Sequence, residues 1–158
     1  MAYKIITPLA GYQAIAVTDT TKNHDLGTVV QGTDPTYGSG EFIYLQGVAS
    51  TAVGDVVRIT TGFTTVRGVA SGRGKCAVAM SANVANQYGW YQISGEAVVN
   101  AAATVVASTP AYLTATTGSV DDAVVSGDKI DGMVFSAART GAGTVTAILN
   151  YPCANGNG

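Results

Sequence analysis

One long segment of this chain carries almost no charge, which restricts where it can lie in a fold. Between residues 76 and 120 the only charged residue is Glu96. Serine, threonine, asparagine, glutamine and glycine interrupt its apolar residues, and no run reaches the ~18 apolar residues of a membrane-spanning helix. We therefore expect no membrane partner. Because charged residues are depleted from the cores of protein–protein interfaces, we expect part of this segment to lie buried between subunits.

Composition divides the chain near Gly40. Residues 1–40 are polar and rich in turn-forming residues, and few of their apolar positions repeat at a regular period. We interpret them as an extended N-terminal arm that carries one or two short strands, at 12–17 and at 29–30. Residues 41–152 are expected to form a compact β domain, and residues 153–158 a flexible tail.

Short runs rich in valine, threonine, isoleucine and tyrosine follow one another after residue 41. Glycine or aspartate separates them about every 8–12 residues, a spacing typical of a sandwich or barrel. The run at 101–109 contains alanines that favour a helix and β-branched residues that favour an extended chain, and its neighbours favour the extended form. The fold class predicted is all-β and barrel-like. Strands are expected at 42–48, 55–60, 64–69, 75–81, 88–94, 96–100, 111–114, 129–138 and 143–150.

Residues able to carry out catalysis do not gather in any recognisable motif. His24, the only histidine, lies in a loop-like region. The sequence contains no G-x-S-x-G motif, which would supply a serine nucleophile for it. Glu96 has no second acid nearby in the sequence, whereas glycoside hydrolysis usually needs two carboxylates. The aspartates at 121–131 lack the order of a calcium loop and indicate a surface turn. We expect no enzyme activity, no cofactor and no metal site.

The basic residues and the cysteines indicate neither a nucleic-acid partner nor a disulfide framework. Arg67, Arg73 and Lys75 form the densest basic group, which is too small to neutralise a row of phosphates. Cys76 and Cys153 are the only cysteines, and we expect both thiols to be free. The N-terminus lacks the uninterrupted apolar region of a secretory signal, so synthesis in a cytoplasm is expected.

The aromatic segment QYGWYQ, at 87–92, is the best candidate for a contact surface. On a strand, Tyr88 and Trp90 lie on one face and Tyr91 on the other. Such residues can form a core, and an exposed pair can bind a sugar or a protein. Since aromatic residues are enriched at protein interfaces, we predict a subunit or capsid interface here, and we extend it to Tyr37 and Phe42.

Four strand-like segments follow one another after residue 53: GDVV at 54–57, KCAVAM at 75–80, GWYQISG at 89–95 and TVTAILNYP at 144–152. Their order resembles that of the capsid decoration proteins of tailed phages, which are also called cement proteins. The resemblance covers about residues 26–152, and its motifs are structural rather than catalytic.

The resemblance implies a small β-barrel or β-tulip domain that assembles as a homotrimer on the outside of a phage head, after synthesis in the bacterial host cytoplasm. Such a protein contacts the major capsid protein and stabilises its lattice, and it provides no catalytic residues to transfer. Residues 1–40 would correspond to an arm that becomes ordered on a neighbour. The alternative is a carbohydrate- or receptor-binding module of a phage fibre or tail, which requires Tyr88 and Trp90 to form an exposed platform.

Overall fold

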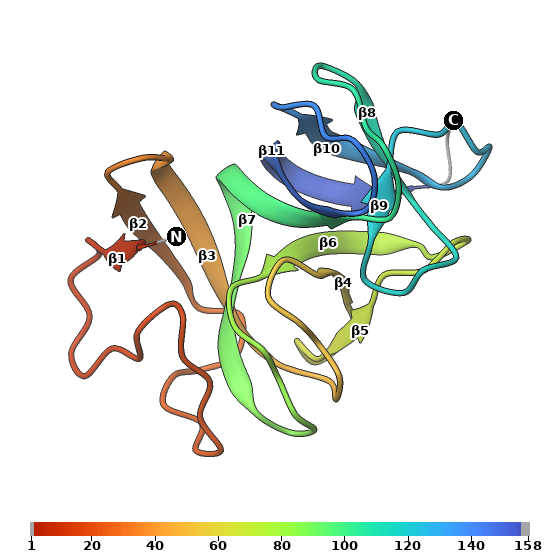
Figure 1. Ribbon diagram of the computed structural model, residues 1–158. Coiled ribbons are helices and arrows are strands. Elements are labelled where there is room, and N and C mark those ends of the chain that lie inside the picture. The colour runs from red at the N-terminus through yellow and green to blue at the C-terminus, as the bar shows by residue number, and fades with distance from the viewer. Residues whose placement is uncertain (1, 156–158) are drawn as a thin grey trace.

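The computed structural model describes residues 2–155, and this part of the chain consists of strands joined by turns, without a helix. No helix that could cross a membrane is found there. The predicted all-β, barrel-like fold class is confirmed. The strands form one eleven-stranded sheet (Figure 1). They are β1 (Lys4–Ile5), β2 (Val29–Asp34), β3 (Gly38–Gln46), β4 (Val56–Ile59), β5 (Thr65–Arg67), β6 (Gly74–Ala79), β7 (Tyr88–Ala101), β8 (Pro110–Leu113), β9 (Val120–Asp121), β10 (Lys129–Phe135) and β11 (Gly143–Ala154).

Strand β7 belongs to two closed rings of strands, and Figure 1 shows it between them. The C-terminal ring runs from β7 through β11, β10, β8 and β9 and back to β7. All of its pairs are antiparallel except β7 with β9, which meet in parallel at Ala101 and Val120. Aliphatic and aromatic side chains fill this ring, among them Val99, Leu113, Ile130, Phe135 and Leu149.

The N-terminal ring runs from β7 through β6, β4 and β5 and returns to β7 along β3. A bridge between Gln46 and Thr64 closes it, and the Gln46 amide donates to the Phe63 carbonyl oxygen at 3.1 Å. Strand β6 also pairs with β11, which ties the two rings together a second time. The smaller core of this ring includes Ile43, Leu45, Val57, Tyr91 and Ile93.

The charge-poor segment supplies β7, the strand that the two rings share. It contains most of β6 and all of β7 and β8, whose side chains contribute to the cores on both sides. Each large apolar side chain buried there contributes about 1.5–3 kcal/mol. The expectation that its QYGWYQ part lies between subunits is wrong for Trp90 and Tyr91, which are buried within a single chain, while Gln87 and Tyr88 are half-buried.

The residues before Gly40 do not form an extended arm, and Gly40 itself lies inside β3. Strand β1 pairs with β2, and β2 pairs with β3 over six residue pairs. Tyr3, Ile15 and Val30 are buried against the aromatic side chains of β3 and β7. The polar composition concealed this packing because the apolar residues that cover the sheet are scattered and follow no period.

Most predicted strands are present, with differences that have local causes. The segments at 88–94 and 96–100 are one strand, since Gly95 continues the pairing. Residues 12–17 are irregular, and the run at 101–109 contributes Ala101 to the end of β7 and otherwise forms only a bridge at Val105. The predicted tail begins inside β11, which ends at Ala154, and its last three residues lie outside the described part of the chain.

Gly95 marks the point at which β7 passes from one ring to the other. Before it, β7 pairs with β3 and β6, and from Ser94 onward it pairs with β11. Gly95 has a φ of +92°, and a Cβ at this position would collide with the Ser39 carbonyl oxygen and lie 2.9 Å from the Gly40 Cα. Only glycine has both the backbone freedom and the small size that this crossing needs.

Replacing Gly95 by alanine is expected to lower the free energy of unfolding by about 2–4 kcal/mol, because a backbone clash adds to the strain of a positive φ. Gly141→Ala is the control, since Gly141 has a φ of +75° but nothing within 4 Å of the position of a Cβ. It should cost about 1 kcal/mol. Urea unfolding measures both, and equal losses would contradict the crowding at Gly95.

Candidate functional site

Three of the five predicted interface residues lie in the interior of the single chain. Phe42, Trp90 and Tyr91 are each 0% exposed. A side chain without exposed surface cannot contact a second molecule while the fold is intact, so this part of the prediction is wrong. Tyr37 and Tyr88 are half-buried and pack against the cluster that contains Phe42 and Trp90.

The predicted division of the aromatic segment between two faces is confirmed. Trp90 packs with Tyr88 on the side covered by the N-terminal residues, whereas Tyr91 points into the N-terminal ring. Because Trp90 is covered, the exposed Tyr88–Trp90 platform that a sugar-binding module would need is absent. Burial raises the pKa of Tyr91 to about 12, and its hydroxyl accepts a hydrogen bond from Asn83 at 2.8 Å.

Gln13 connects the N-terminal segment to this aromatic core. Its backbone oxygen accepts the Trp90 indole N–H at 2.8 Å, and its side-chain oxygen accepts the Tyr44 hydroxyl at 2.7 Å. Its side-chain nitrogen donates to the carbonyl oxygens of Val17 and Tyr88. His24 belongs to the same group, since its Nε2 accepts the Gln13 amide at 3.1 Å. The only histidine is therefore half-buried in a contact within the chain.

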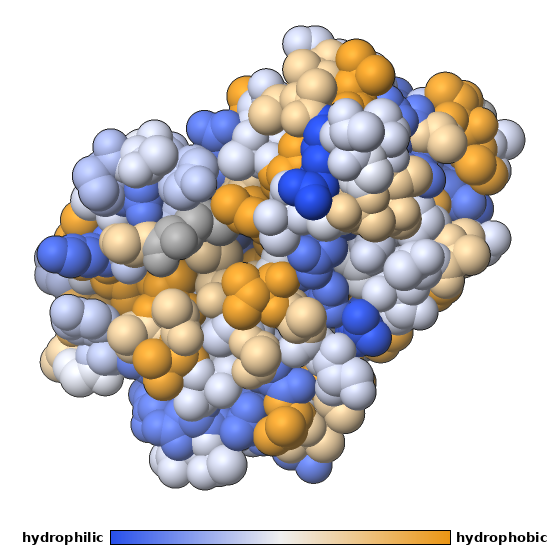
Figure 2. Space-filling model, in the orientation of Figure 1, coloured by the Kyte–Doolittle hydropathy of each residue, from blue (hydrophilic) through white to orange (hydrophobic). Residues whose placement is uncertain are grey.

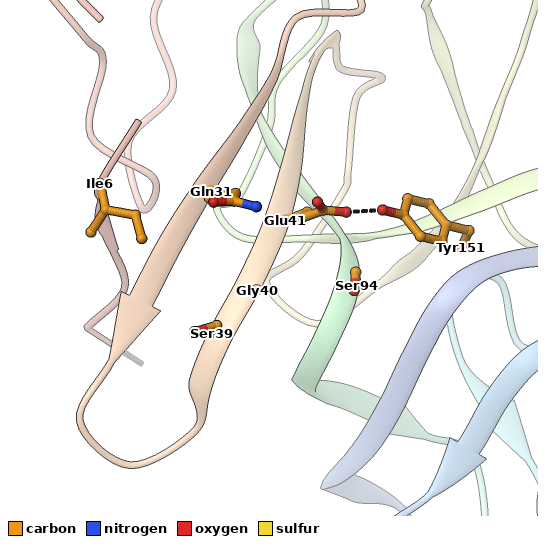
Figure 3. A pocket seen from close by; sticks show the side chains of 7 residues that line it. All are labelled: Ile6, Gln31, Ser39, Gly40, Glu41, Ser94 and Tyr151. Atoms are coloured by element: carbon orange, nitrogen blue, oxygen red, sulfur yellow. Dashed lines mark hydrogen bonds between the residues drawn. The ribbon is translucent and has the colours of Figure 1, made fainter. Parts of the chain in front are cut away.

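A polar cleft opens beside this core, between β3 and the end of β11 (Figure 3). The Tyr151 hydroxyl donates to a carboxylate oxygen of Glu41, and this hydrogen bond raises the pKa of Tyr151. The cleft has a volume of about 290 Å³. We call it the Glu41–Tyr151 cleft, and the residues that line it are Ile6, Gln31, Ser39, Gly40, Glu41, Ser94 and Tyr151.

An irregularity in the β10–β11 pairing accompanies the unusual backbone of Tyr151. The register of the two strands shifts between Asp131 and Met133, around Gly132 with a φ of +77°. Tyr151, nearby in β11, has a φ of +48°, which is uncommon for a bulky residue. None of the residues that line the cleft was among the predicted site residues, although Gly132 inside a strand pattern is a signal for a bulge.

The remaining exposed apolar side chains form separate patches. Figure 2 shows hydrophobic groups divided by polar ones over one face of the molecule. The pairing registers identify one row that crosses three strands, in which Val134 of β10 is opposite both Pro110 of β8 and Ile148 of β11. Val134 and Ile148 are 40% and 53% exposed. We call these three residues the outer row.

Both cysteine thiols are free, as predicted. Burial raises the pKa of Cys76 to about 12, while Cys153 is only half-buried near the end of β11.

The aspartates at 121–131 hold turns, because Asp121 accepts the Ala123 amide and Asp128 accepts the Ser71 amide at 2.5 Å. Among the described residues, no group of three or more histidines, cysteines and acids is placed to hold a metal ion.

The four segments that carry the sequence resemblance lie next to one another in the sheet. They contribute to β4, β6, β7 and β11, and each of these strands pairs with at least one of the others. Comparison with protein-family models finds no match to this chain, and comparison with curated proteins finds none. A functional assignment therefore depends on the residues and their arrangement.

Replacing Gln13 by alanine should lower the free energy of unfolding by about 2–3 kcal/mol, because buried partners such as the Tyr44 hydroxyl lose their hydrogen bonds. Gln31→Ala is the matched control, since this exposed side chain makes no hydrogen bond within the described part of the chain. Its effect should stay within about 0.5 kcal/mol. Similar urea midpoints for the two variants would contradict the role given to Gln13.

The folded protein should react with iodoacetamide at Cys153 and remain unmodified at Cys76 at pH 8. The thiolate is the reactive form, and burial both raises the Cys76 pKa and blocks access to its sulfur. Peptide mass spectrometry identifies the modified residue, and urea should make both cysteines reactive. If Cys76 and Cys153 were modified at the same rate in the folded protein, the burial of the Cys76 thiol would be ruled out.

Proposed function

We propose that this chain is a structural protein of a phage particle that binds the outer surface of the capsid as a trimer and stabilises the lattice of the major capsid protein. The observation that carries the proposal is the adjacency of the four segments that resemble capsid decoration proteins. Segments separated by up to about a hundred residues of sequence meet in one continuous part of the sheet. Their order along the chain thus corresponds to a structural unit.

The arrangement of the strands suits a protein that resists deformation. The two rings share β7 and are joined a second time by the pairing of β6 with β11, so two separate sets of strand pairs hold them together. A protein that binds only the mature lattice stabilises that state by mass action. A trimer makes three linked contacts, and such linkage raises the effective affinity without strong single contacts.

The outer row is the surface that we assign to contacts between copies in the trimer. Its three side chains are apolar, exposed and directly opposite one another on neighbouring strands. Glu96, opposite Ile148 on β7, lies at one end of the row and accepts a hydrogen bond from Ser136. An apolar centre with a polar margin is the usual composition of a protein interface.

The purified protein should have three times the monomer mass by light scattering at micromolar concentration. Val134→Lys should shift it toward the monomer by at least about tenfold in dissociation constant, since a lysine in the centre of an apolar contact must lose its hydration. Val124→Lys is the control, because Val124 is 76% exposed in a loop and is not one of the three residues of the outer row. A monomeric wild-type protein would contradict the trimer, and an unaffected Val134→Lys trimer would exclude the outer row.

A cryo-electron microscopy map of the phage particle tests the location. The density of this protein is expected on the outside of the head, in contact with the major capsid protein. Density in a tail or fibre, with none on the head, would contradict the proposed function.

A further inference from the structure

The Glu41–Tyr151 cleft has the chemistry of a binding site. We propose that it binds a neutral saccharide, with Glu41 and Gln31 holding hydroxyl groups and the Tyr151 ring covering an apolar face of the sugar. Its volume of about 290 Å³ is at the small end of ligand pockets, which suits one terminal sugar unit. This inference does not depend on the capsid role, because it uses a different surface from the outer row.

The cleft offers hydrogen-bonding groups that the fold does not use. The side chains of Gln31, Ser39 and Ser94 line it, and none of the three makes a side-chain hydrogen bond within residues 2–155. They come from β2, β3 and β7, and Figure 3 shows Gln31 beside Glu41 on the neighbouring strand. An amide and two hydroxyls both donate and accept hydrogen bonds. Sugar hydroxyls do the same, so each can find a partner here.

Glu41 and Tyr151 are held in place before any ligand arrives. The Tyr151 hydroxyl occupies one carboxylate oxygen of Glu41, which leaves the other able to accept from a ligand. Tyr151 is 59% exposed at the edge of the cleft, and Ile6 lies on the opposite side. Tyrosine offers an apolar ring together with a polar tip, which matches the apolar and hydroxyl-bearing sides of a sugar ring. Side chains fixed in advance lose little conformational entropy on binding.

The charge of the cleft selects among ligands. Glu41 is the only charged residue among those that line it, so the carboxylate disfavours acidic sugars and phosphates. A lysine or arginine side chain would satisfy Glu41, but such a group only donates hydrogen bonds and would leave the donors of Gln31 and the serines unused. A neutral polyhydroxyl ligand uses both kinds of group. With a single carboxylate, the cleft is suited to binding a sugar rather than to cleaving a glycosidic bond.

Fluorescently labelled protein on an array of neutral, acidic and amino-bearing oligosaccharides tests the proposal. Binding is expected to at least one neutral glycan, and titration calorimetry with that glycan then compares variants. Glu41→Gln should weaken binding by about tenfold, the loss of one charge-assisted hydrogen bond. Tyr151→Ala should weaken it further, whereas Tyr151→Phe, which keeps the ring, should retain more affinity than Tyr151→Ala.

Matched controls separate the cleft from the rest of the surface. Tyr12→Ala removes a tyrosine of similar exposure, 56%, that does not line the cleft, and Asp25→Asn neutralises an exposed acid elsewhere. Neither should change binding. Gln31→Ala provides a cleft variant with little effect on folding, and it should weaken binding.

Three outcomes would overturn the inference. These are the absence of binding to any neutral glycan, binding that survives in both Glu41→Gln and Gln31→Ala, and a preference for an arginine-rich peptide over every glycan. None of them bears on trimer formation, which is measured separately by light scattering, so failure of the cleft and failure of the capsid role can be told apart.

Discussion

The close approach of β7 to β3 at Gly95 is the constraint on which the rest of the structure depends. At this point the backbone passes so close to Ser39 and Gly40 that no side chain fits. At Gly95 the pairing partners of β7 change, so that one strand of 14 residues closes two rings. Its first part pairs with β3 and β6, and its second part pairs with β11. The close approach also brings Glu41 and Ser94 to one place, where β11 delivers Tyr151.

The lack of charge in the first part of β7 follows from its burial on both faces. A strand that two rings use has a core on each side over much of its length, and a buried charge without a partner is costly. Trp90 and Tyr91 illustrate this, since adjacent residues of one strand are each 0% exposed on opposite faces. Lack of charge was interpreted as a sign of burial between subunits, whereas Trp90 and Tyr91 are buried within the chain.

Local sequence pattern was sufficient to predict the all-β class and most strands, because alternation and turn residues act over a few positions. It failed where distant contacts decide the structure. Tyr3, Ile15 and Val30 follow no period, and only the aromatic faces of β3 and β7 explain their burial. The Glu41–Tyr151 pair joins residues 110 positions apart, which no local pattern can indicate. Neither Glu41 nor Tyr151 was therefore among the predicted site residues.

Both the outer row and the Glu41–Tyr151 cleft belong to a fold in which Trp90 and Tyr91 are buried inside each chain. Trp90 is the only tryptophan, so its fluorescence reports directly on this point. Emission and acrylamide quenching can be followed while the protein is diluted from micromolar to nanomolar concentration. A blue-shifted, poorly quenched emission at every concentration is predicted, because the indole is covered by its own chain. A red shift with stronger quenching on dilution would show burial between subunits and contradict the account.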